Sequence, residues 1–177
     1  MKQTALMFAA LALCASALSA QTPAAAQNPI SGGQKFLNNM VKNNIIRSAE
    51  KMPEENYSFK PTPDVRSFGQ LIGHVADAQY LFCSAVLGKA NPALGIEKSK
   101  TSKADLVQAL KDGFAYCDEA YNGLTDAQAG ELVKFFGNEQ AKTTVLAFNT
   151  AHNNEHYGNI VTYLRLKGLV PPSSERR

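Results

Sequence analysis

Apolar residues recur every three or four positions through most of this chain, which is the spacing that lets a helix bury one of its faces. The pattern predicts four helices, at about residues 33–51, 68–87, 103–121 and 142–166. No alternating strand of useful length interrupts them. The stretch 125–140 fits either a short helix or a turn with a brief strand-like run at 132–136, and both interpretations stay open.

The ends of these helices carry residues with known capping preferences. Ser67 is suited to cap the start of the second helix, and Gly88 to end it. Ser102 and Asp105 have the spacing of a capping box ahead of the third helix, with aspartate in place of glutamate. Pro53 ends the first helix. The helix assignments are therefore supported by their ends as well as by their apolar faces.

Each helix has an apolar face that predicts part of the core. In the first helix these positions are Phe36, Leu37, Met40, Val41, Ile45 and Ile46. In the last helix, at about 100° per residue, one sector holds Val145, Phe148, Ile160, Tyr163 and Leu166. Four amphipathic helices bury such faces most simply as a bundle. We therefore predict an all-α four-helix bundle with a long loop between helices 1 and 2.

All three histidines of the chain lie on these helices. His152 and His156 are four residues apart within the apolar sector of the last helix, so their imidazoles lie on neighbouring turns. His74 shares a flank of the second helix with Leu71 and Ala78. Three converging imidazoles would repel if protonated, and each must satisfy two ring nitrogens. A divalent cation resolves both difficulties, so we predict that His74, His152 and His156 bind one metal ion.

The two ends of the chain differ in composition from the predicted bundle. Residues 1–20 have the layout of a secretory signal peptide, with a basic start, an apolar run and small residues up to Ala20. We interpret 21–32 as a linker, 33–172 as the four-helix metal-binding domain and 173–177 as a polar tail. The protein is expected to be exported to the periplasm or the extracellular space. Cleavage could follow Ala20 or Ala26.

Charge and hydropathy exclude two classes of partner. The formal net charge is +3, and no basic stripe with interleaved aromatics is present, so no nucleic-acid partner is expected. No second apolar stretch reaches membrane-spanning length, so stable membrane insertion of the mature chain is not expected either. The expected partner is a small-molecule substrate, and a homodimer is left open.

Removal of the signal peptide would leave two cysteines, Cys83 and Cys117. In an oxidising compartment they could form a disulfide, which on the chain-entropy model would stabilise the fold by roughly 3–4 kcal/mol. They could equally be two separate thiols.

Two stretches resemble the DinB/YfiT-like metalloenzyme family. Residues 55–77, ENYSFKPTPDVRSFGQLIGHVAD, place one histidine early in the second helix, at His74. Residues 152–172, HNNEHYGNIVTYLRLKGLVPP, place a pair four apart, at His152 and His156. The resemblance covers nearly the whole mature chain. It implies a four-helix bundle whose three histidines hold a divalent ion, Zn²⁺ or Ni²⁺, and it implies relatives that are thiol-dependent S-transferases and isomerases.

Three histidine ligands leave one coordination position open, as in catalytic zinc sites. An open position can activate water or a thiol, or polarise a carbonyl. The thiol cosubstrates of the family are cytosolic. If the chain is exported, hydrolysis is therefore about as favoured as thiol transfer. We interpret the chain as a metal-dependent hydrolase or S-transferase acting on a small molecule, with Glu155 and Asp77 as candidates to orient a ligand or move a proton. The alternatives are a non-catalytic bundle whose metal is structural or carried, and a metal-free binding module.

Overall fold

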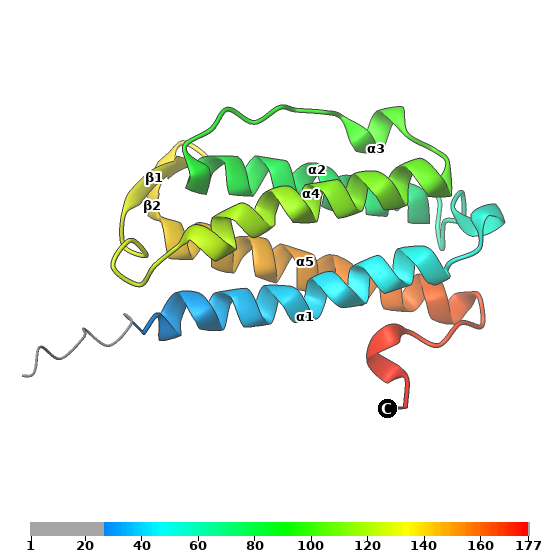
Figure 1. The fold of residues 1–177 in the computed structure, drawn as a ribbon. Coiled ribbons are helices and arrows are strands. Elements are labelled where there is room, and N and C mark those ends of the chain that lie inside the picture. The colour runs from blue at the N-terminus through cyan, green and yellow to red at the C-terminus, as the bar shows by residue number, and fades with distance from the viewer. Residues whose placement is uncertain (1–26, 177) are drawn as a thin grey trace, which may run out of the picture.

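The computed structural model describes residues 27–176, and its four long helices form a bundle (Figure 1). The predicted signal peptide and the first part of the predicted linker lie outside the described residues. The elements in chain order are α1 (Pro29–Lys51), η1 (Glu54–Asn56), α2 (Phe68–Leu87), α3 (Ile96–Ser99), α4 (Lys103–Gly123), β1 (Leu132–Phe135), β2 (Asn138–Ala141), α5 (Lys142–Leu166) and η2 (Pro172–Ser174). The predicted all-α four-helix bundle is therefore confirmed. Within the described part of the chain, no helix combines the length and apolar content needed to cross a bilayer.

The helices pack in two pairs (Figure 1). One pair is α2 and α4, the other is α1 and α5, and the pairs meet where α2 contacts α5 and α1 contacts α4. The short helix α3 packs on α2. Strands β1 and β2 form an antiparallel hairpin, in which Leu132 pairs with Ala141 and Phe135 with Asn138. The stretch that the pattern left ambiguous is thus a hairpin, and it leads directly into α5.

The predicted N-cap residues of α2 and α4 both cap their helices, but the reciprocal capping box forms at α2, whereas at α4 the Asp105 carboxylate accepts a hydrogen bond from the Ser102 hydroxyl instead. At the start of α2, Ser67 accepts a hydrogen bond from the backbone N–H of Gln70, and the Gln70 side chain accepts one from the backbone N–H of Ser67. Gly88 ends α2 in the left-handed conformation, which glycine adopts without steric cost. Ser102 caps α4 by accepting from the backbone N–H of Asp105. These caps fix where the two helices begin.

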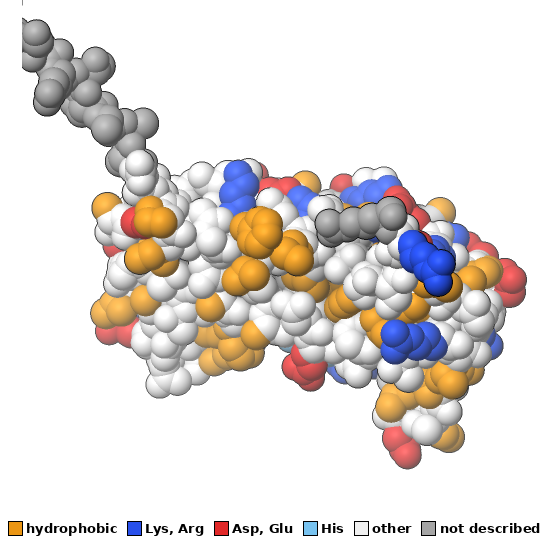
Figure 2. All heavy atoms as spheres, turned by 90° about the horizontal axis from the view of Figure 1, so that it is seen from below, with side chains coloured by type: hydrophobic (Ala, Val, Ile, Leu, Met, Phe, Trp, Pro, Cys, Tyr) orange, Lys and Arg blue, Asp and Glu red, His pale blue; other side chains and the backbone are white. Residues whose placement is uncertain are grey.

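The buried face of α1 differs from the predicted one. Phe36, Leu37 and Met40 are 63, 51 and 52% exposed, and the view onto the molecule from the side of α1 shows apolar side chains at the surface (Figure 2). The buried residues of α1 are Ser31, Asn38, Val41, Ile45, Ser48 and Ala49. Val41 and Ile45 were predicted correctly as core, whereas the prediction of Phe36, Leu37 and Met40 was wrong, because small side chains and the Asn38 amide fill the rest of this face.

The apolar sector predicted for α5 is correct only in part. Val145, Ile160 and Tyr163 are buried, whereas Phe148 and Leu166 are 45 and 58% exposed. Buried amides occupy part of the face that the apolar pattern assigned to large side chains.

A network of buried amides connects the helices. Gln79 of α2 donates to the Asn153 side chain at 2.8 Å, Asn149 donates to the Gln79 carbonyl oxygen at 3.1 Å, and Asn153 donates to Asn149 at 3.3 Å. All three side chains are fully buried. Asn153 also lies 3.5 Å from Asn38 of α1, and Asn149 donates to Tyr121 of α4 at 3.3 Å. Because hydrogen bonds are directional, this network fixes the helices along their axes as well as side by side.

A disulfide joins Cys83 of α2 to Cys117 of α4. The two Cα atoms are 5.2 Å apart, and both residues are fully buried. Of the two alternatives that the sequence left open, the bridge is the one present. It covalently links the helix that carries His74 to its neighbour, and Asn149 donates to the Cys117 sulfur at 3.3 Å.

Replacing Gln79 by leucine should destabilise the bundle strongly. The change leaves the buried Asn153 oxygen without its donor, which costs about 1–3 kcal/mol, and it also removes one of the acceptors of the Asn149 amide. We expect the free energy of unfolding, measured in urea, to fall by about 2–4 kcal/mol. The matched control is Gln108→Leu on the exposed side of α4, which should change it by less than about 0.5 kcal/mol. Equal effects of the two changes would contradict a structural role for the network.

Candidate metal centre

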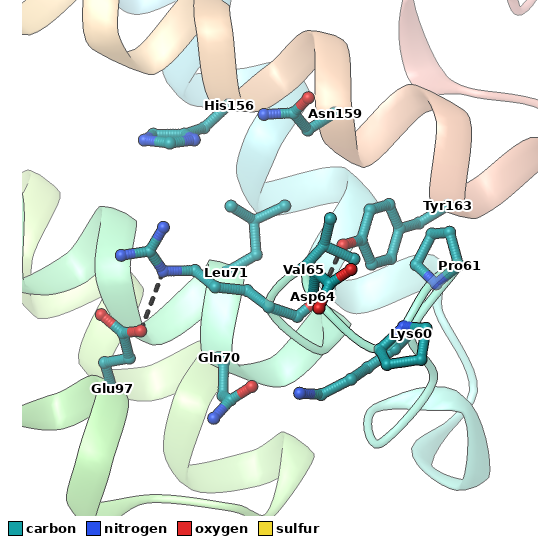
Figure 3. A pocket seen from close by; sticks show the side chains of 12 residues that line it. Lys60, Pro61, Asp64, Val65, Gln70, Leu71, Glu97, His156, Asn159 and Tyr163 are labelled. Carbon is teal, nitrogen blue, oxygen red and sulfur yellow. Dashed lines mark hydrogen bonds and ion pairs between the residues drawn. The ribbon is translucent and has the colours of Figure 1, made fainter.

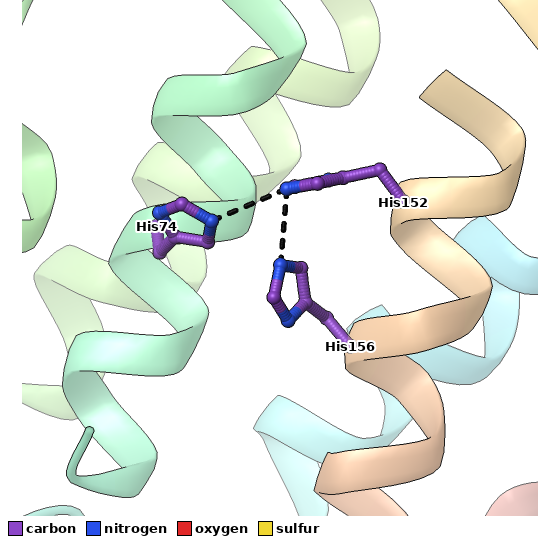
Figure 4. Close-up of side chains that lie close together, drawn as sticks. All are labelled: His74, His152 and His156. Atoms are coloured by element: carbon purple, nitrogen blue, oxygen red, sulfur yellow. Dashed lines mark hydrogen bonds between the residues drawn. The ribbon is translucent and has the colours of Figure 1, made fainter. Parts of the chain in front are cut away.

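The three predicted histidines meet where α2 contacts α5 (Figure 4). His74 projects from α2, and His152 and His156 project from successive turns of α5. The Nε2 atom of His152 lies 3.2 Å from Nε2 of His74 and 3.0 Å from Nε2 of His156. All three ligand atoms lie within 4.8 Å of one another. The structure therefore brings together every residue that the sequence assigned to the metal site.

This arrangement suits a cation better than a set of hydrogen bonds. An imidazole nitrogen carries either one hydrogen or one in-plane lone pair, so Nε2 of His152 can form a well-aligned hydrogen bond with only one of its two neighbours. Four-coordinate zinc with nitrogen ligands at about 2.0–2.1 Å would separate those nitrogens by about 3.3 Å. The two observed distances are within a few tenths of an ångström of that value. The three-histidine group could hold a divalent metal ion.

The electrostatic surroundings keep the three rings neutral, which is the state that binds a metal. Burial lowers the pKa of His152 to about 3 and that of His156 to about 4, because the charged form loses solvation. The neighbouring imidazoles lower the pKa of His152 further. Burial also lowers the pKa of His74, while Glu97 acts in the opposite direction. At neutral pH all three rings therefore offer a lone pair.

Glu97 also contacts this site, although no sequence pattern predicted it. Its carboxylate lies 3.2 Å from Nδ1 of His74 and also accepts a hydrogen bond from Nε of Arg66 at 2.8 Å. A carboxylate on the far nitrogen of a ligating histidine fixes the ring tautomer and strengthens the nitrogen donor. Among the described residues, Nδ1 of His152 and Nδ1 of His156 are buried without such a partner. Of the three histidines, His74 is therefore the one whose ring orientation is set by a carboxylate.

Asp77, one of the two predicted acidic candidates, hydrogen-bonds the segment that carries Glu97, and it influences His74 only through its charge, which raises the pKa of that ring against the larger effect of burial. Its two carboxylate oxygens accept hydrogen bonds from the backbone N–H groups of Ile96 and Glu97, both at 2.9 Å. These bonds hold the first turn of α3 against α2. Asp77 therefore helps to place the carboxylate that contacts His74.

Gly73 allows α3 to approach α2 closely. A Cβ atom at this position would lie 2.7 Å from Cα of Glu97 and 2.9 Å from its backbone nitrogen. Any larger residue would push α3 away and withdraw Glu97 from His74. A glycine directly before a helical histidine was the available signal for such an approach, but the sequence alone does not say which segment approaches.

Glu155, the other predicted candidate, lies on the exposed side of α5. Its charge raises the pKa of His156, against the larger effect of burial. Glu155 therefore influences the site through its charge, whereas Glu97 does so through contact with His74.

Two clefts reach the histidines. One, of about 570 Å³, has His156 at its wall and is lined by polar side chains that include Lys60, Arg66 and Asn159 (Figure 3). The other, of about 480 Å³, is bounded by His74 and His152 and is largely apolar. A small molecule could therefore reach the three nitrogens from a polar or from an apolar side.

Comparison with known proteins identifies the family. The model of the DinB superfamily matches residues 40–160, a range that includes all three histidines. The chain belongs to the DinB superfamily. The resemblance that the two sequence stretches indicated is therefore confirmed.

Individual relatives of this DinB chain share its fold. The uncharacterized protein YjoA of Bacillus subtilis is 27% identical over 124 residues, which make up 68% of this chain and 79% of YjoA. The crystal structure of YjoA, described as a DinB-like protein, covers 85% of this chain and 100% of its own at 25% identity, with a TM-score of 0.64. A DinB-like protein from Bacillus cereus superposes with a TM-score of 0.71 at 19% identity, covering 80% of this chain and 95% of that one.

The metal-free DinB protein should lose stability as the pH falls from about 7 to about 5. Unfolded histidines take up protons near pH 6.5, whereas in the fold the pKa values of His152 and His156 stay at about 3 and 4. In this window the unfolded state binds more protons, so the free energy of unfolding falls with pH; above about pH 7 the effect vanishes.

Urea unfolding in the presence of a chelator, at several pH values, measures this dependence. The chain has three histidines and all of them lie at this site, so no other histidine contributes. His152→Gln should make the dependence shallower. A free energy of unfolding that stays constant between about pH 7 and about pH 5 would contradict the burial of neutral rings.

Replacing Gly73 by alanine should destabilise the protein and weaken metal binding together. The added Cβ meets the α3 backbone, and such overpacking costs about 1–3 kcal/mol. The matched control is Gly158→Ala in α5, where nothing lies within 4 Å of the new Cβ. That change should be neutral or stabilise by up to about 1 kcal/mol. Urea unfolding and competition with a metal chelator measure the two effects, and unchanged metal affinity in Gly73→Ala would argue against the role of Glu97.

Proposed function

We propose that this DinB protein is a metal-dependent enzyme that acts on a small molecule, with His74, His152 and His156 as the ligands of one divalent ion. The observation that carries the proposal is the convergence of three neutral imidazole nitrogens between two clefts: Nε2 of His152 lies 3.0 and 3.2 Å from the other two, and all three lie within 4.8 Å of one another. Imidazole ligands suit zinc and nickel among the divalent ions. Three protein ligands next to open space are typical of catalytic sites, whereas structural zinc sites are closed by four.

Hydrolysis is the reaction type that we favour. A divalent ion at this site supplies Lewis acidity, which activates a nucleophile and polarises a carbonyl. Around it, Glu97 holds the His74 ring in one orientation, and Arg66 holds Glu97. Tyr163 donates to the backbone oxygen of Arg66 at 2.6 Å and so fixes the loop that lines the polar cleft. The cleft is lined by both signs of charge, Lys60 and Arg66 with Asp64 and Glu97, and because Arg66 pairs with Glu97 we propose Lys60 as the residue that contacts an anionic part of a substrate.

The disulfide supports a location outside the cytosol. In such a compartment we favour water as the nucleophile over a low-molecular-weight thiol. Disulfides persist in oxidising compartments, and the Cys83–Cys117 bridge is fully buried between two helices. We propose that the protein is exported by the segment 1–20 and acts in the periplasm or outside the cell. The low-molecular-weight thiols used by the family's S-transferases are cytosolic, so thiol transfer is the less favoured reaction.

Replacing His152 or His156 by alanine should abolish stoichiometric metal. Each change removes one of three ligands, and the remaining pair cannot hold a divalent ion tightly. Elemental analysis of untagged protein, purified from its native compartment, should give about one ion per chain for the wild type and almost none for either variant. Asn154→Ala is the matched control, because this exposed residue lies on the same helix between the two histidines. A full metal content in His152→Ala would contradict the site.

A non-catalytic role for the metal remains the second candidate, because the site bridges α2 and α5. If the ion is mainly a structural link, chelation should lower the melting temperature by far more than binding linkage to an already folded bundle requires. For an enzyme we expect only modest destabilisation, since the amide network and the disulfide hold the bundle without metal. Loss of the folded state on chelation would favour the structural role.

A further inference from the structure

Two non-glycine residues of the described chain have a positive φ, Ala93 at 48° and Phe136 at 47°. This is the left-handed region, which side chains of L-residues disfavour. Both residues line the apolar cleft beside His74 and His152. Strained backbone positions concentrate at ligand-binding sites, because folding stability alone selects against them. Both strained positions of the described chain thus lie at the same cleft.

Phe136 occupies a turn position where another residue would be more stable. Phe136 and Gly137 are the central residues of the β1–β2 turn, and both have positive φ. Such a two-residue turn favours Asn-Gly. The Phe136 side chain is 63% exposed, so burial in the core does not compensate for the strain. A phenylalanine at this strained position is explained if its ring contacts a bound molecule.

A continuous set of aromatic rings connects Phe136 to the histidines. The ring centroid of Phe136 lies 6.0 Å from that of Phe148 and 6.2 Å from that of Phe82. Phe82 in turn packs edge-to-face on His152, with the centroids 5.2 Å apart. Phe148 and Leu81, 45 and 40% exposed, extend this wall. An apolar group lying against these rings would be next to the ligand nitrogens.

The lining of this cleft does not favour an ionic occupant. Asp77 is the one Asp, Glu, Lys or Arg among the described residues that line it, and both of its oxygens already accept backbone hydrogen bonds. The cleft of about 480 Å³ lies in the size range of small-molecule sites. The polar cleft on the other side of the histidines is lined by four charged residues instead, Lys60, Asp64, Arg66 and Glu97. The two sides of the metal site therefore differ in the chemistry they accept.

We propose that Phe82, Phe136 and Phe148 form the substrate's apolar subsite, which binds an uncharged aromatic or branched group attached to the reacting centre. The position of the reacting centre at the metal rests on the proposed function, whereas binding of an apolar group in the subsite does not require the metal. Phe136 is a specificity-determining residue that the hairpin holds at the mouth of the cleft. The substrate class is then an ester or amide with a bulky apolar substituent next to its carbonyl.

The first experiment tests the subsite without metal. Benzyl alcohol is titrated into the chelated protein, and backbone amide shifts are followed by NMR. Saturable shifts should cluster at residues 78–82, 93–95, 135–137 and 148–152. Phe136→Asn should weaken this binding about tenfold, because a ring contact is lost, while the melting temperature should rise by a few degrees because asparagine suits the turn.

Phe36→Asn is the matched control, because Phe36 on α1 is also 63% exposed. It should leave benzyl alcohol binding unchanged. Equal binding by the Phe136→Asn and Phe36→Asn variants, or shifts scattered over the surface, would overturn the subsite. Shifts of the same cleft residues that depend on protein concentration without probe would show a second copy seated there, and would overturn it as well.

The second experiment joins the subsite to the metal. Acetohydroxamate and benzohydroxamate are titrated into the zinc-loaded protein by calorimetry. Benzohydroxamate should bind about tenfold more tightly, and Phe136→Asn should remove that preference while leaving acetohydroxamate affinity and zinc content unchanged. Equal affinities in the wild type would overturn the placing of the apolar group beside the metal. Failure of both hydroxamates to bind, with benzyl alcohol still bound, would contradict the open metal position and leave the subsite standing.

Discussion

The hydrogen bonds among Gln79, Asn149 and Asn153 set the position of α2 relative to α5 along the bundle. Apolar contacts between helices are non-directional, so hydrophobic burial alone tolerates sliding of one helix past another. An amide triangle does not, because a shift of one turn, about 5.4 Å, would break all its inter-helix bonds. His152 lies between Asn149 and Asn153 in sequence, and His74 precedes Gln79 by little more than a turn. The meeting of three imidazole nitrogens within ångströms depends on this fixed register.

The candidate metal centre consists of two parts that are held in place by different elements. His152 and His156 are carried by one continuous helix, which fixes their spacing without help from the rest of the chain. His74 comes from α2, and its ring orientation depends on Glu97, which α3 brings in from a loop. Gly73 and Asp77 hold α3 in place, one by leaving room and the other by binding its backbone. A ligand set that is preorganised in this way loses little entropy when a cation binds.

Much of the fold and of the site could be predicted from the sequence because both follow from periodicity. The long helices, their caps, the bundle and the three histidines come from spacing that a helix converts directly into faces. The core face of α1 could not be predicted in full, because Asn38 is buried through its partner Asn153 on α5 and Ser48 through a bond to the Asn44 backbone oxygen, while Phe36 and Met40 are more than half exposed. Glu97 was missed for the same reason: its contact with His74 crosses 23 positions and depends on a backbone approach at Gly73. Periodicity in the sequence shows which residues can share a helix face, but polar contacts between distant segments determine which of those faces is buried.

His74 is oriented by a four-residue helix outside the bundle. The properties of the metal site can therefore change without a change in the four long helices. The nitrogen donor strength of His74 depends on the carboxylate that faces its other nitrogen, and that carboxylate belongs to a connecting segment, α3, of which Ile96 alone is buried in the core. Substitutions in this segment can change how strongly an ion is held, or how acidic it makes a bound molecule, while the helices and the other two ligands stay as they are. A scaffold built this way can acquire new reactivity through its connecting loops, with little risk to its ability to fold.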